Sequence, residues 1–553
     1  MGVMAAVLSD VFGAELGDHS NSTEPVAPGY LPRQTGEGFT LPAVPPQAVE
    51  LPSSGGPAVS IRHIVFRGNS VIGTDELDAI AAPFLQRKLT EADLEDLRQK
   101  LTRHYIDRGY INSGALLVKD AVADDAFTYE LVEGRLKAIR LRGLDGLNEN
   151  YVVKRLVADE DAPLNVGDIR ERYQLLLEDP LFERLNARLI PDSRLGEAVL
   201  DIDVVRARPY QLTLFANNYR PPSIGENSYG LNGWLRNLTG YGDQLDLSFQ
   251  GGTGSDSDGR YSVAWRMPLN YYGTVLSLQA EHGRSEVIER PLAPLNIKST
   301  LEATDIGISQ VFVLSLRHKF TVGINQVDRK NSTTLLGQPF SFTAGEQNGV
   351  TKVSTQRLWQ EYSFRDERQA LVARLTLNSS RNNLQSLTGL PPGTPEISHS
   401  YTFWLGQAQY ARQVFDNGTQ LSLRGTLQSS STTLSSMDRM SVGGVNTVRG
   451  YRENQLIRDA GNIMNAELRF PVLPGGGSAL KVDLIPFYDR ASGKNQGEHS
   501  DVLSSAGVAG RASWNGLVFD LAVARRLKHP ESVSGNGTLQ DHSIHLQLSY
   551  SIF

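Results

Sequence analysis

From Arg208 to the end of the chain, apolar and polar residues alternate in short segments. In Gln244–Gln250 one face carries only apolar side chains, and the other face carries only polar ones. Leu371–Asn378 and Gln420–Gln428 show the same period of two. Strict alternation predicts β-strands that are buried on one side and wetted on the other. No helical pattern of useful length interrupts the series, so this part of the chain is predicted to be all β.

This alternating region contains about 346 residues, 208 to 553. Turn-rich stretches separate its segments, at Gly251–Gly259, Asn383–Pro395, Pro474–Gly477 and Ser492–Ser500. A strand that crosses a membrane needs roughly 9–11 residues plus its share of turn and loop. Sixteen strands at about 20–22 residues each would fill the length. Hydropathy alone does not distinguish such a barrel from a soluble β protein, because a barrel wall alternates lipid-facing and lumen-facing residues.

The region before the alternating segments contains an internal repeat. The first copy predicts a β-α-α-β-β order, with elements at Ser60–Arg67, Thr74–Ala82, Thr90–Arg108, Ala115–Lys119 and Ala126–Glu133. Thr90 and Asp93 predict a cap at the start of the long helix. The second copy repeats the order at Leu136–Arg142, Asn148–Val157, Gly167–Glu178, Asn186–Ile190 and Ala198–Val205. Two consecutive units of equal length indicate a pair of small α+β domains.

Composition excludes several classes of function. The chain has no Cys, so it has no disulfide, no thiolate metal site and no cysteine nucleophile. A net charge of -7 argues against a general nucleic-acid partner. After the N-terminus no run of 18 apolar residues predicts a transmembrane helix. G-x-S-x-G, P-loop and H-E-x-x-H motifs are absent, so we expect no enzyme, no cofactor and no catalytic metal.

Ser441–Tyr451, SVGGVNTVRGY, predicts a loop, because its glycines let the backbone turn back on itself. Inside a barrel, Arg449 needs an acceptor, since a buried guanidinium must be paired. Asp489 is a candidate, because it follows the apolar and aromatic residues of a predicted strand, IPFYDRASG. Glu453 and Asp459 are nearer in sequence and stay open as alternatives.

Two short motifs resemble the signatures of the Omp85 superfamily of outer-membrane transporters, and more narrowly its two-partner secretion branch. They are VRGY, formed by Val448, Arg449, Gly450 and Tyr451, and FYD, in which Phe487 and Asp489 are the matching residues. In that superfamily the Arg lies on a long loop folded into the pore and pairs with an Asp on the inner barrel wall. The resemblance implies sixteen strands, and a gating or loop-anchoring role for these six residues.

The first α+β unit resembles a POTRA domain in detail, through FRGNS at 66–70, HYIDRGYINSGALL at 104–117 and LVEGRL at 131–136. The second unit resembles one in outline. Each such sheet offers edges with unpaired N–H and C=O groups, to which an extended polypeptide can add as a strand. The resemblance implies that these domains lie in the periplasm and bind the protein that is exported.

The function that the resemblance implies is export of one large unfolded partner exoprotein, such as an adhesin, haemolysin or contact-dependent toxin, across the bacterial outer membrane. The barrel would contact outer-membrane lipid, be inserted by the barrel assembly machinery and act as a monomer. The first alternative is an assembly factor of the same superfamily, which usually carries three or more POTRA domains. The second alternative is a porin or surface adhesin, which would not need VRGY or its paired acid.

The N-terminal region, residues 1–57, contains two different stretches. Val3–Phe12 is a short apolar run that predicts either the remnant of a secretory signal or a short helix. The resemblance accommodates both, because these transporters are exported and many carry an N-terminal helix that plugs the pore. Asn21–Pro57 is rich in Pro, Gly and Ser and predicts a linker. The chain is therefore expected to divide into 1–57, POTRA 1 at 58–134, POTRA 2 at 135–207 and a barrel at 208–553, with its inward loop at about 441–461.

Overall fold

The computed structural model describes residues 39–40, 59–60, 62–85, 87–118, 126–157, 159, 161–194, 196–254, 258–385, 397–473, 480–528 and 537–552. The predicted signal remnant or plug helix, most of the linker and the terminal Phe lie outside these residues. The chain forms two compact units, one built from residues 35–208 and one from residues 209–553. Among the described residues, no helix has the length and apolar character needed to cross a bilayer.

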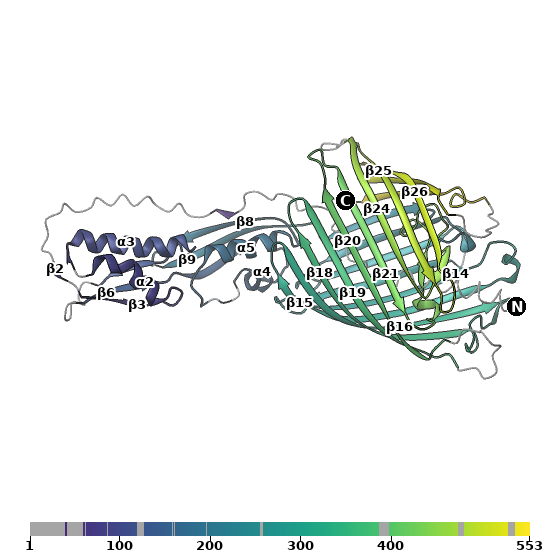
Figure 1. Ribbon diagram of the computed structural model, residues 1–553, viewed down its shortest axis with the longest axis horizontal. Helices are drawn as coiled ribbons and strands as arrows, with labels where there is room; N and C mark the ends of the chain where they lie inside the picture. The colour runs from purple at the N-terminus through teal and green to yellow at the C-terminus, as the bar shows by residue number, and fades with distance from the viewer. Residues whose placement is uncertain are drawn as a thin grey trace. The chain divides into compact units, whose positions relative to one another are not determined.

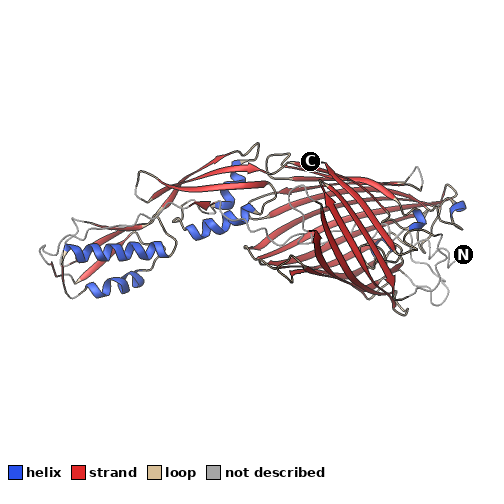
Figure 2. Ribbon diagram, turned by 90° about the horizontal axis from the view of Figure 1, so that it is seen from above, coloured by secondary structure: helices blue, strands red, loops and turns tan. Residues whose placement is uncertain are grey.

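The first α+β unit follows the predicted β-α-α-β-β order. Its main elements are β3 (His63–Arg67), α2 (Thr74–Ala81), α3 (Glu91–Asp107), β5 (Gly114–Leu117) and β6 (Ala126–Val132), with the short β2 (Val59–Ser60), η1 (Ala82–Phe84) and β4 (Lys88–Leu89) between them. β6 lies in the middle of the sheet, parallel to β3 and antiparallel to β5. Leu97, Leu101 and Tyr129 are fully buried in the core that α3 forms with this sheet. Figure 2 shows that the helices, in blue, are nearly confined to the two α+β units.

The cap predicted for the long helix is confirmed. The backbone N–H of Thr90 donates to the Asp93 carboxylate at 2.8 Å, and the backbone N–H of Asp93 donates to the Thr90 hydroxyl at 3.3 Å. This reciprocal capping box satisfies donors for which the helix itself has no acceptor. α3 consequently starts at Glu91.

The second α+β unit repeats the order. Its elements are β7 (Arg135–Arg142), α4 (Glu149–Leu156), α5 (Val166–Leu177), β8 (Phe182–Pro191) and β9 (Glu197–Arg206). The strand predicted at 186–190 is longer than expected, because β8 starts at Phe182. Glu183 and Arg184 are both exposed at a register shift against β9. This irregularity interrupts the alternation of apolar and polar residues, so the pattern does not predict the start of the strand. A short segment of the linker region, β1 (Phe39–Thr40), pairs in parallel with the outer edge of β8.

The second compact unit is a closed β-barrel, whose long tilted strands are seen in Figure 1. Among the described residues its sixteen long strands are β10 (Tyr210–Asn217), β11 (Ser228–Arg236), β12 (Gln244–Gly252), β13 (Gly259–Pro268), β14 (Thr274–Glu286), β15 (Lys298–Leu314), β16 (His318–Leu335), β18 (Val350–Arg365), β19 (Gln369–Asn382), β20 (Ser400–Gln413), β21 (Gln420–Ser430), β24 (Ala460–Leu473), β25 (Lys481–Lys494), β26 (Asp501–Trp514), β27 (Leu517–Arg526) and β28 (Ile544–Ile552). All neighbours are antiparallel, and β28 closes the circle by pairing with β10. The mainly β fold predicted from the alternating segments, with a sixteen-stranded barrel, is confirmed.

The two faces of the barrel wall differ in chemistry. Large apolar side chains such as Ile306, Leu358 and Met464 are exposed on the outside, at 56%, 52% and 60%.

The connections between strands differ in length at the two ends of the barrel: β26 and β27 are joined by a two-residue turn, whereas residues 431–459 join β21 to β24. Short turns at one end and long loops at the other are typical of outer-membrane barrels, in which the long loops are extracellular.

The long connection of residues 431–459, called the inward loop below, is folded into the barrel. It contains η4 (Ser436–Asp438), β22 (Met440–Val442) and β23 (Leu456–Arg458), and β22 pairs with β23 as a small hairpin. Apolar residues of the loop, including Val448 and Tyr451, pack with Ala491 of β25 and Leu503 of β26 in a buried cluster. The loop thus has its own apolar core against the inner wall.

Candidate functional site

The guanidinium of Arg449 meets the carboxylate of Asp489 on the inner wall of the barrel. Nε donates to Oδ2 and Nη2 donates to Oδ1, each at 2.8 Å, so the pair is bidentate. The backbone N–H of Arg449 also donates to Asp489, at 3.1 Å. Asp489 has no exposed surface, and the Arg449 side chain is 7% exposed. On β25 the flanking Tyr488 and Arg490 are exposed on the outer face, so alternation turns Asp489 inward.

Three further wall residues complete the surroundings of this pair. Glu467 of β24 accepts from Arg449 Nη1 at 2.7 Å. The Phe487 ring lies under the guanidinium, 3.6 Å from its central carbon, as in a cation–π contact. Asn465 donates to Asp489 at 2.8 Å and to the Thr447 carbonyl at 2.5 Å. A single arginine on the inward loop is therefore held by two acids and one aromatic ring.

Gly450 brings the loop backbone into direct contact with the last strands of the barrel. Its φ is +89°, and a Cβ there would lie 2.7 Å from the Cβ of Ala524 on β27. Its N–H donates to His545 of β28 at 3.1 Å, and its carbonyl accepts from Arg526 at 2.5 Å and from Ser543 at 2.9 Å. Only glycine combines this left-handed conformation with so close an approach.

The other residues of the VRGY motif are buried. Val448 lies in the apolar cluster of the loop, and the Tyr451 hydroxyl donates to the Ser504 carbonyl at 2.9 Å. All six residues singled out from the sequence, from Val448 to Asp489, are consequently brought into one region of the inner wall.

The two alternative acceptors considered for Arg449 have other partners, so both alternatives were wrong. The Glu453 carboxylate accepts from the backbone N–H of Val445 at 2.6 Å, and the backbone N–H of Glu453 donates to Gln540 at 2.8 Å. Asp459 is fully buried and pairs with Arg439 at 3.1 Å. Both acids are closer to Arg449 in sequence than Asp489 is. The Asp459 carboxylate also accepts from the backbone N–H of Gln496, between β25 and β26, at 3.2 Å.

A second buried ion pair joins the inward loop to another part of the wall, and sequence reasoning missed it. Asp438 of η4 pairs with Arg329 of β16, and neither side chain is exposed. Tyr401 of β20 donates to Asp438 at 2.7 Å, and Ser380 of β19 donates at 3.0 Å. Arg329 Nη1 also donates to the Met437 carbonyl at 2.5 Å. Nothing local in the sequence marks this pair, because its two members are 109 residues apart.

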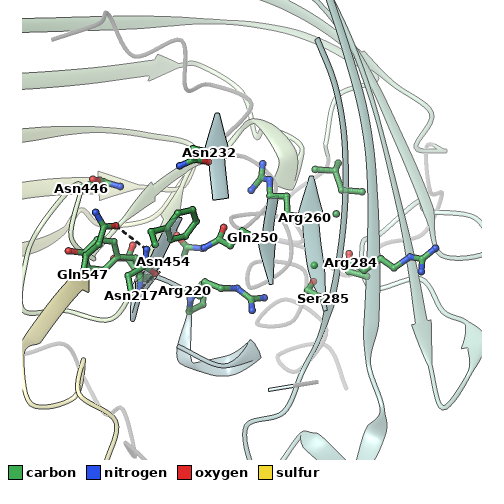
Figure 3. Close-up of a pocket in the computed structure, with 18 of the residues that line it drawn as sticks. Asn217, Arg220, Asn232, Gln250, Arg260, Arg284, Ser285, Asn446, Asn454 and Gln547 are labelled. Carbon is green, nitrogen blue, oxygen red and sulfur yellow. Dashed lines mark hydrogen bonds between the residues drawn. The ribbon is translucent and has the colours of Figure 1, made fainter. Parts of the chain in front are cut away.

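The inward loop leaves a polar cavity of about 440 Å³ along strands β10 to β15 and β28. In Figure 3, Asn446, Asn454 and Gln547 lie on one side of it, and Arg260 and Ser285 lie on the other. Most lining side chains are amides, hydroxyls or guanidinium groups. The chemistry of this wall can exchange hydrogen bonds with a passing polypeptide backbone without requiring one sequence.

No grouping of metal ligands was found in the described part of the chain. The arrangement of charges is instead one of paired acids and bases between a loop and a wall.

Comparisons with known proteins agree with this architecture. A family model described as haemolysin secretion/activation protein ShlB/FhaC/HecB matches residues 196–512, and a ShlB-type POTRA model matches residues 59–134. The chain is 24% identical over 422 residues to the outer membrane transporter CdiB of Dickeya dadantii, covering 75% of this chain and 73% of that protein. It is 21% identical over 446 residues to the heme/hemopexin transporter protein HuxB of Haemophilus influenzae, covering 78% and 75%.

The fold is shared with solved structures. CdiB from Escherichia coli matches with a TM-score of 0.67 at 19% identity, covering 92% of this chain and 93% of that one. The family model covers more than half of the present chain, and a POTRA model precedes its barrel. The chain therefore belongs to the ShlB/FhaC/HecB family of haemolysin secretion/activation proteins, and it is an outer-membrane pore of two-partner secretion that exports a partner exoprotein, with POTRA domains in the periplasm.

Proposed function

We propose that this transporter exports one large partner protein in an unfolded form, of the adhesin, haemolysin or contact-dependent toxin class, and that the inward loop is its gate. The observation that carries the proposal is the buried bidentate pair of Arg449 and Asp489 between loop and wall. Breaking such a pair from one side leaves a buried charge without compensation, which costs about 3–5 kcal/mol. The loop is thus held in one position until a substrate supplies competing contacts.

The gate is proposed to have two anchors of opposite polarity. At the first, the loop contributes the cation, Arg449, and β25 contributes the acid. At the second, the loop contributes the acid, Asp438, and β16 contributes the cation. The anchors bind strands that are far apart around the barrel, so together they stretch the loop across the lumen. Release of one anchor would leave the loop tethered by the other and by Arg452, which pairs with Glu289 and Asp541.

The substrate path is proposed to follow the polar cavity beside β10 to β15. This side of the lumen carries neither anchor, so a moving chain would not have to pass through the apolar cluster of the loop. No ATP is present in the periplasm, and folding of the passenger outside the cell is the proposed driving force. Catalysis, a cofactor and a nucleic-acid partner have no part in this scheme.

The POTRA domains are proposed to bind the exoprotein by strand addition, at one particular edge of each sheet. At β5 the N–H of Ala115 donates to Thr102 at 3.1 Å and its carbonyl accepts from Arg98 at 3.3 Å, so α3 side chains cap that edge. The outer edge of β8 is occupied by β1. The opposite edges, β3 and β7, each pair on one side only among the described residues, and they are the proposed docking strands.

The proposed division of the chain is 1–57, 58–134, 135–207 and 208–553. The barrel is proposed to act as a monomer after insertion by the barrel assembly machinery. An assembly factor of the same superfamily is the competing function. The described residues contain two α+β units, whereas assembly factors usually carry three or more, and this count favours secretion.

The test is to express the neighbouring reading frame in a bacterial host, with and without this chain, and to assay the medium. The passenger is expected outside the cell only when the transporter is present. If the passenger stays inside, and other outer-membrane barrels assemble poorly when the chain is deleted from its own host, the proposal is wrong and the assembly function replaces it.

A further inference from the structure

The outward face of the barrel carries a row of charged residues near its extracellular end. His282 of β14 faces Glu302 of β15, which in turn faces Lys330 of β16 and then Lys352 of β18. Arg381 of β19 belongs to the next row, where it pairs across the sheet with Ser354. Alternation along each strand turns all these side chains away from the lumen.

An apolar row lies on the same strands, closer to the end with the short turns. Ile308, Ile324 and Leu358 face one another across β15, β16 and β18, and they are exposed at 46%, 51% and 52%. Lys330 lies six residues beyond Ile324, which is about 20 Å along a strand. With a strand tilt of about 40°, this is about 15 Å along the membrane normal. The charged row therefore lies at the level of lipid headgroups in the outer leaflet.

The surface is hollowed at this level. A groove of about 690 Å³ is lined by the charged row together with hydroxyl and amide groups such as Ser354 and Asn383. Glu302 pairs with Lys330 at 3.0 Å, and Asp328 also faces the groove. Among the described residues, Lys352 and Arg381 form no ion pair. The acids of the groove therefore balance only part of the positive charge of its cations.

The placement of the two lysines indicates what the groove binds. Lys330 and Lys352 are direct cross-strand partners, and like charges in that position repel each other. An anion between them would remove this repulsion. Phosphate suits the site, because lysine and arginine form strong charge-assisted bonds to its oxygens, and the hydroxyl and amide groups suit an attached sugar.

We propose that this groove is a binding site for the phosphorylated sugar headgroup of the outer-leaflet glycolipid, with Lys330, Lys352 and Arg381 as the phosphate-binding residues. The acyl chains of the same lipid lie along the apolar row below. The three proposed phosphate-binding side chains lie on the outside of the wall. Arg329 of the second anchor also lines the groove, but its side chain pairs with Asp438 on the lumen side. The inference does not depend on the gate or on the substrate path.

The test uses the full chain purified in detergent and measures the binding of bisphosphorylated lipid A. The altered protein is Lys330→Gln/Lys352→Gln/Arg381→Gln. The matched control is Lys481→Gln/Arg490→Gln/Lys494→Gln, which removes three exposed cations of β25. We expect the first triple variant to bind at least tenfold more weakly than the unaltered protein, and the control to bind normally. Normal elution and heat-resistant migration of both proteins would show that each barrel is folded.

Two further probes separate a lipid site from a site for free anions. Dephosphorylated lipid A is expected to bind at least tenfold more weakly, and millimolar inorganic phosphate is expected to leave lipid A binding unchanged. Equal binding by the unaltered protein and the first triple variant would overturn the proposal. Full competition by inorganic phosphate, or equal affinity for dephosphorylated lipid A, would overturn it as well.

Discussion

At the scale of single residues, Arg449 is notable for the number of wall groups that its guanidinium engages. Asp489 takes a bidentate pair, Glu467 takes the remaining nitrogen, and Phe487 covers the face. Lysine could supply the charge but neither the planar fork nor the stacking surface. The site therefore requires arginine rather than a generic cation.

Arg449→Ala and Asp489→Ala are each expected to abolish or sharply reduce secretion while the barrel still inserts. Arg449→Ala leaves the buried Asp489 carboxylate without its ion-pair partner, at a cost of about 3–5 kcal/mol to the position of the loop. Asp489→Ala leaves the guanidinium with Glu467 as its remaining acid and without the bidentate pair. The measurement is passenger in the medium against transporter in the outer membrane. Arg490→Ala, which alters the exposed neighbour of Asp489, is the control and should secrete normally. Normal secretion by both alanine variants would show that the Arg449–Asp489 pair is not needed for secretion.

Gly450→Ala is expected to impair secretion as well, because a Cβ would meet Ala524 and the left-handed φ would be strained. The companion change Ala524→Gly removes the steric contact but not the backbone strain. The double variant should therefore secrete more than Gly450→Ala and less than the unaltered transporter, in the same assay. No recovery in the double variant would show that contact with β27 is irrelevant.

Asp438→Asn tests the second anchor, because the amide keeps the shape and loses the charge that faces Arg329. We expect secretion to fall, and single-channel recordings to show more frequent openings, since the loop then loses its ion pair with β16 and keeps those of Arg449 and Arg452. Exchanging the charges, Asp438→Arg with Arg329→Asp, should recover part of the secretion that either single exchange loses. Unchanged secretion and unchanged recordings for Asp438→Asn would mean that the pair has no part in gating.

At this scale the sequence predicted only those residues that belong to recognisable motifs occurring in the expected order along the chain. VRGY and the FYD strand drew attention to Arg449 and Asp489 together. Glu467 and Asn465 were missed because an acid and an amide on an alternating strand look like ordinary lumen residues. Arg329 and Asp438 were missed because only the closed barrel brings β16 and the loop together.

At the scale of elements, periodicity located the helices and strands well, because each has one buried face. α3 is an example: its apolar stripe and its cap together defined where it begins. Irregular register was the main source of error, as at the start of β8. The strand at 481–494 also continues into the predicted turn at 492–500, because Ser492 and Gly493 still pair with β26.

The cap of α3 gives a prediction with a pH dependence. The Thr90 backbone N–H, and then its hydroxyl, donate to Asp93 and lower the pKa of that carboxyl. A lowered pKa stabilises the fold above the unfolded value of about 3.9, and the contribution is lost as pH falls through the folded value. Asp93→Asn should cost about 0.3–1 kcal/mol near pH 7, the usual contribution of a negative charge at a helix N-terminus.

The measurement is amide hydrogen exchange in α3 of the full chain. Exchange near Glu91 should be up to about fivefold faster in Asp93→Asn near pH 7. The difference should start to shrink below about pH 4, the unfolded pKa, and should be lost once pH falls below the lower folded pKa, where the carboxylate of the unaltered chain is protonated. Asp96→Asn, on the exposed side of the same helix, is the control. An equal difference at both pH values would mean that charge does not contribute to the cap.

The edges of the POTRA sheets give a second prediction at this scale. A photo-crosslinking residue at Val65 of β3 should capture the exoprotein that the neighbouring reading frame encodes. The same residue at Leu116 of β5 should not, because α3 side chains cap that edge. The two positions are matched, with exposed fractions of 39% and 38%. Stronger capture at Leu116 would place docking on the edge that we regard as closed.

At the scale of the whole molecule, the barrel and its loop form one closed system. The alternating pattern and the chain length predicted a sixteen-stranded barrel, but the path of the loop through the lumen came from the family resemblance. A glycine-rich loop has no periodic pattern of apolar residues from which its path could be predicted. Its inward course depends on apolar contacts such as Val448 with the wall and on ion pairs that form only in the assembled barrel, such as those of Asp438 and Arg449.

Removal of the loop tip, residues 443–455, should enlarge the pore without destroying the barrel. Most wall contacts are between neighbouring strands, so insertion should continue. Single-channel conductance is expected to rise several-fold over that of the unaltered chain, and secretion should fall because the substrate is no longer guided. A conductance equal to that of the unaltered protein would mean that the loop does not obstruct the lumen.

The seam between the first and last strands has a consequence for biogenesis. β10 cannot pair with β28 until the end of the chain has been made, since Leu212 lies opposite Ile552. The loop donates to His545 on that same last strand, so its docking is coupled to this final pairing. Barrel closure and gate closure then become one event in time. A newly made transporter would enter the membrane with its gate already closed, and the outer membrane would at no stage contain an open pore.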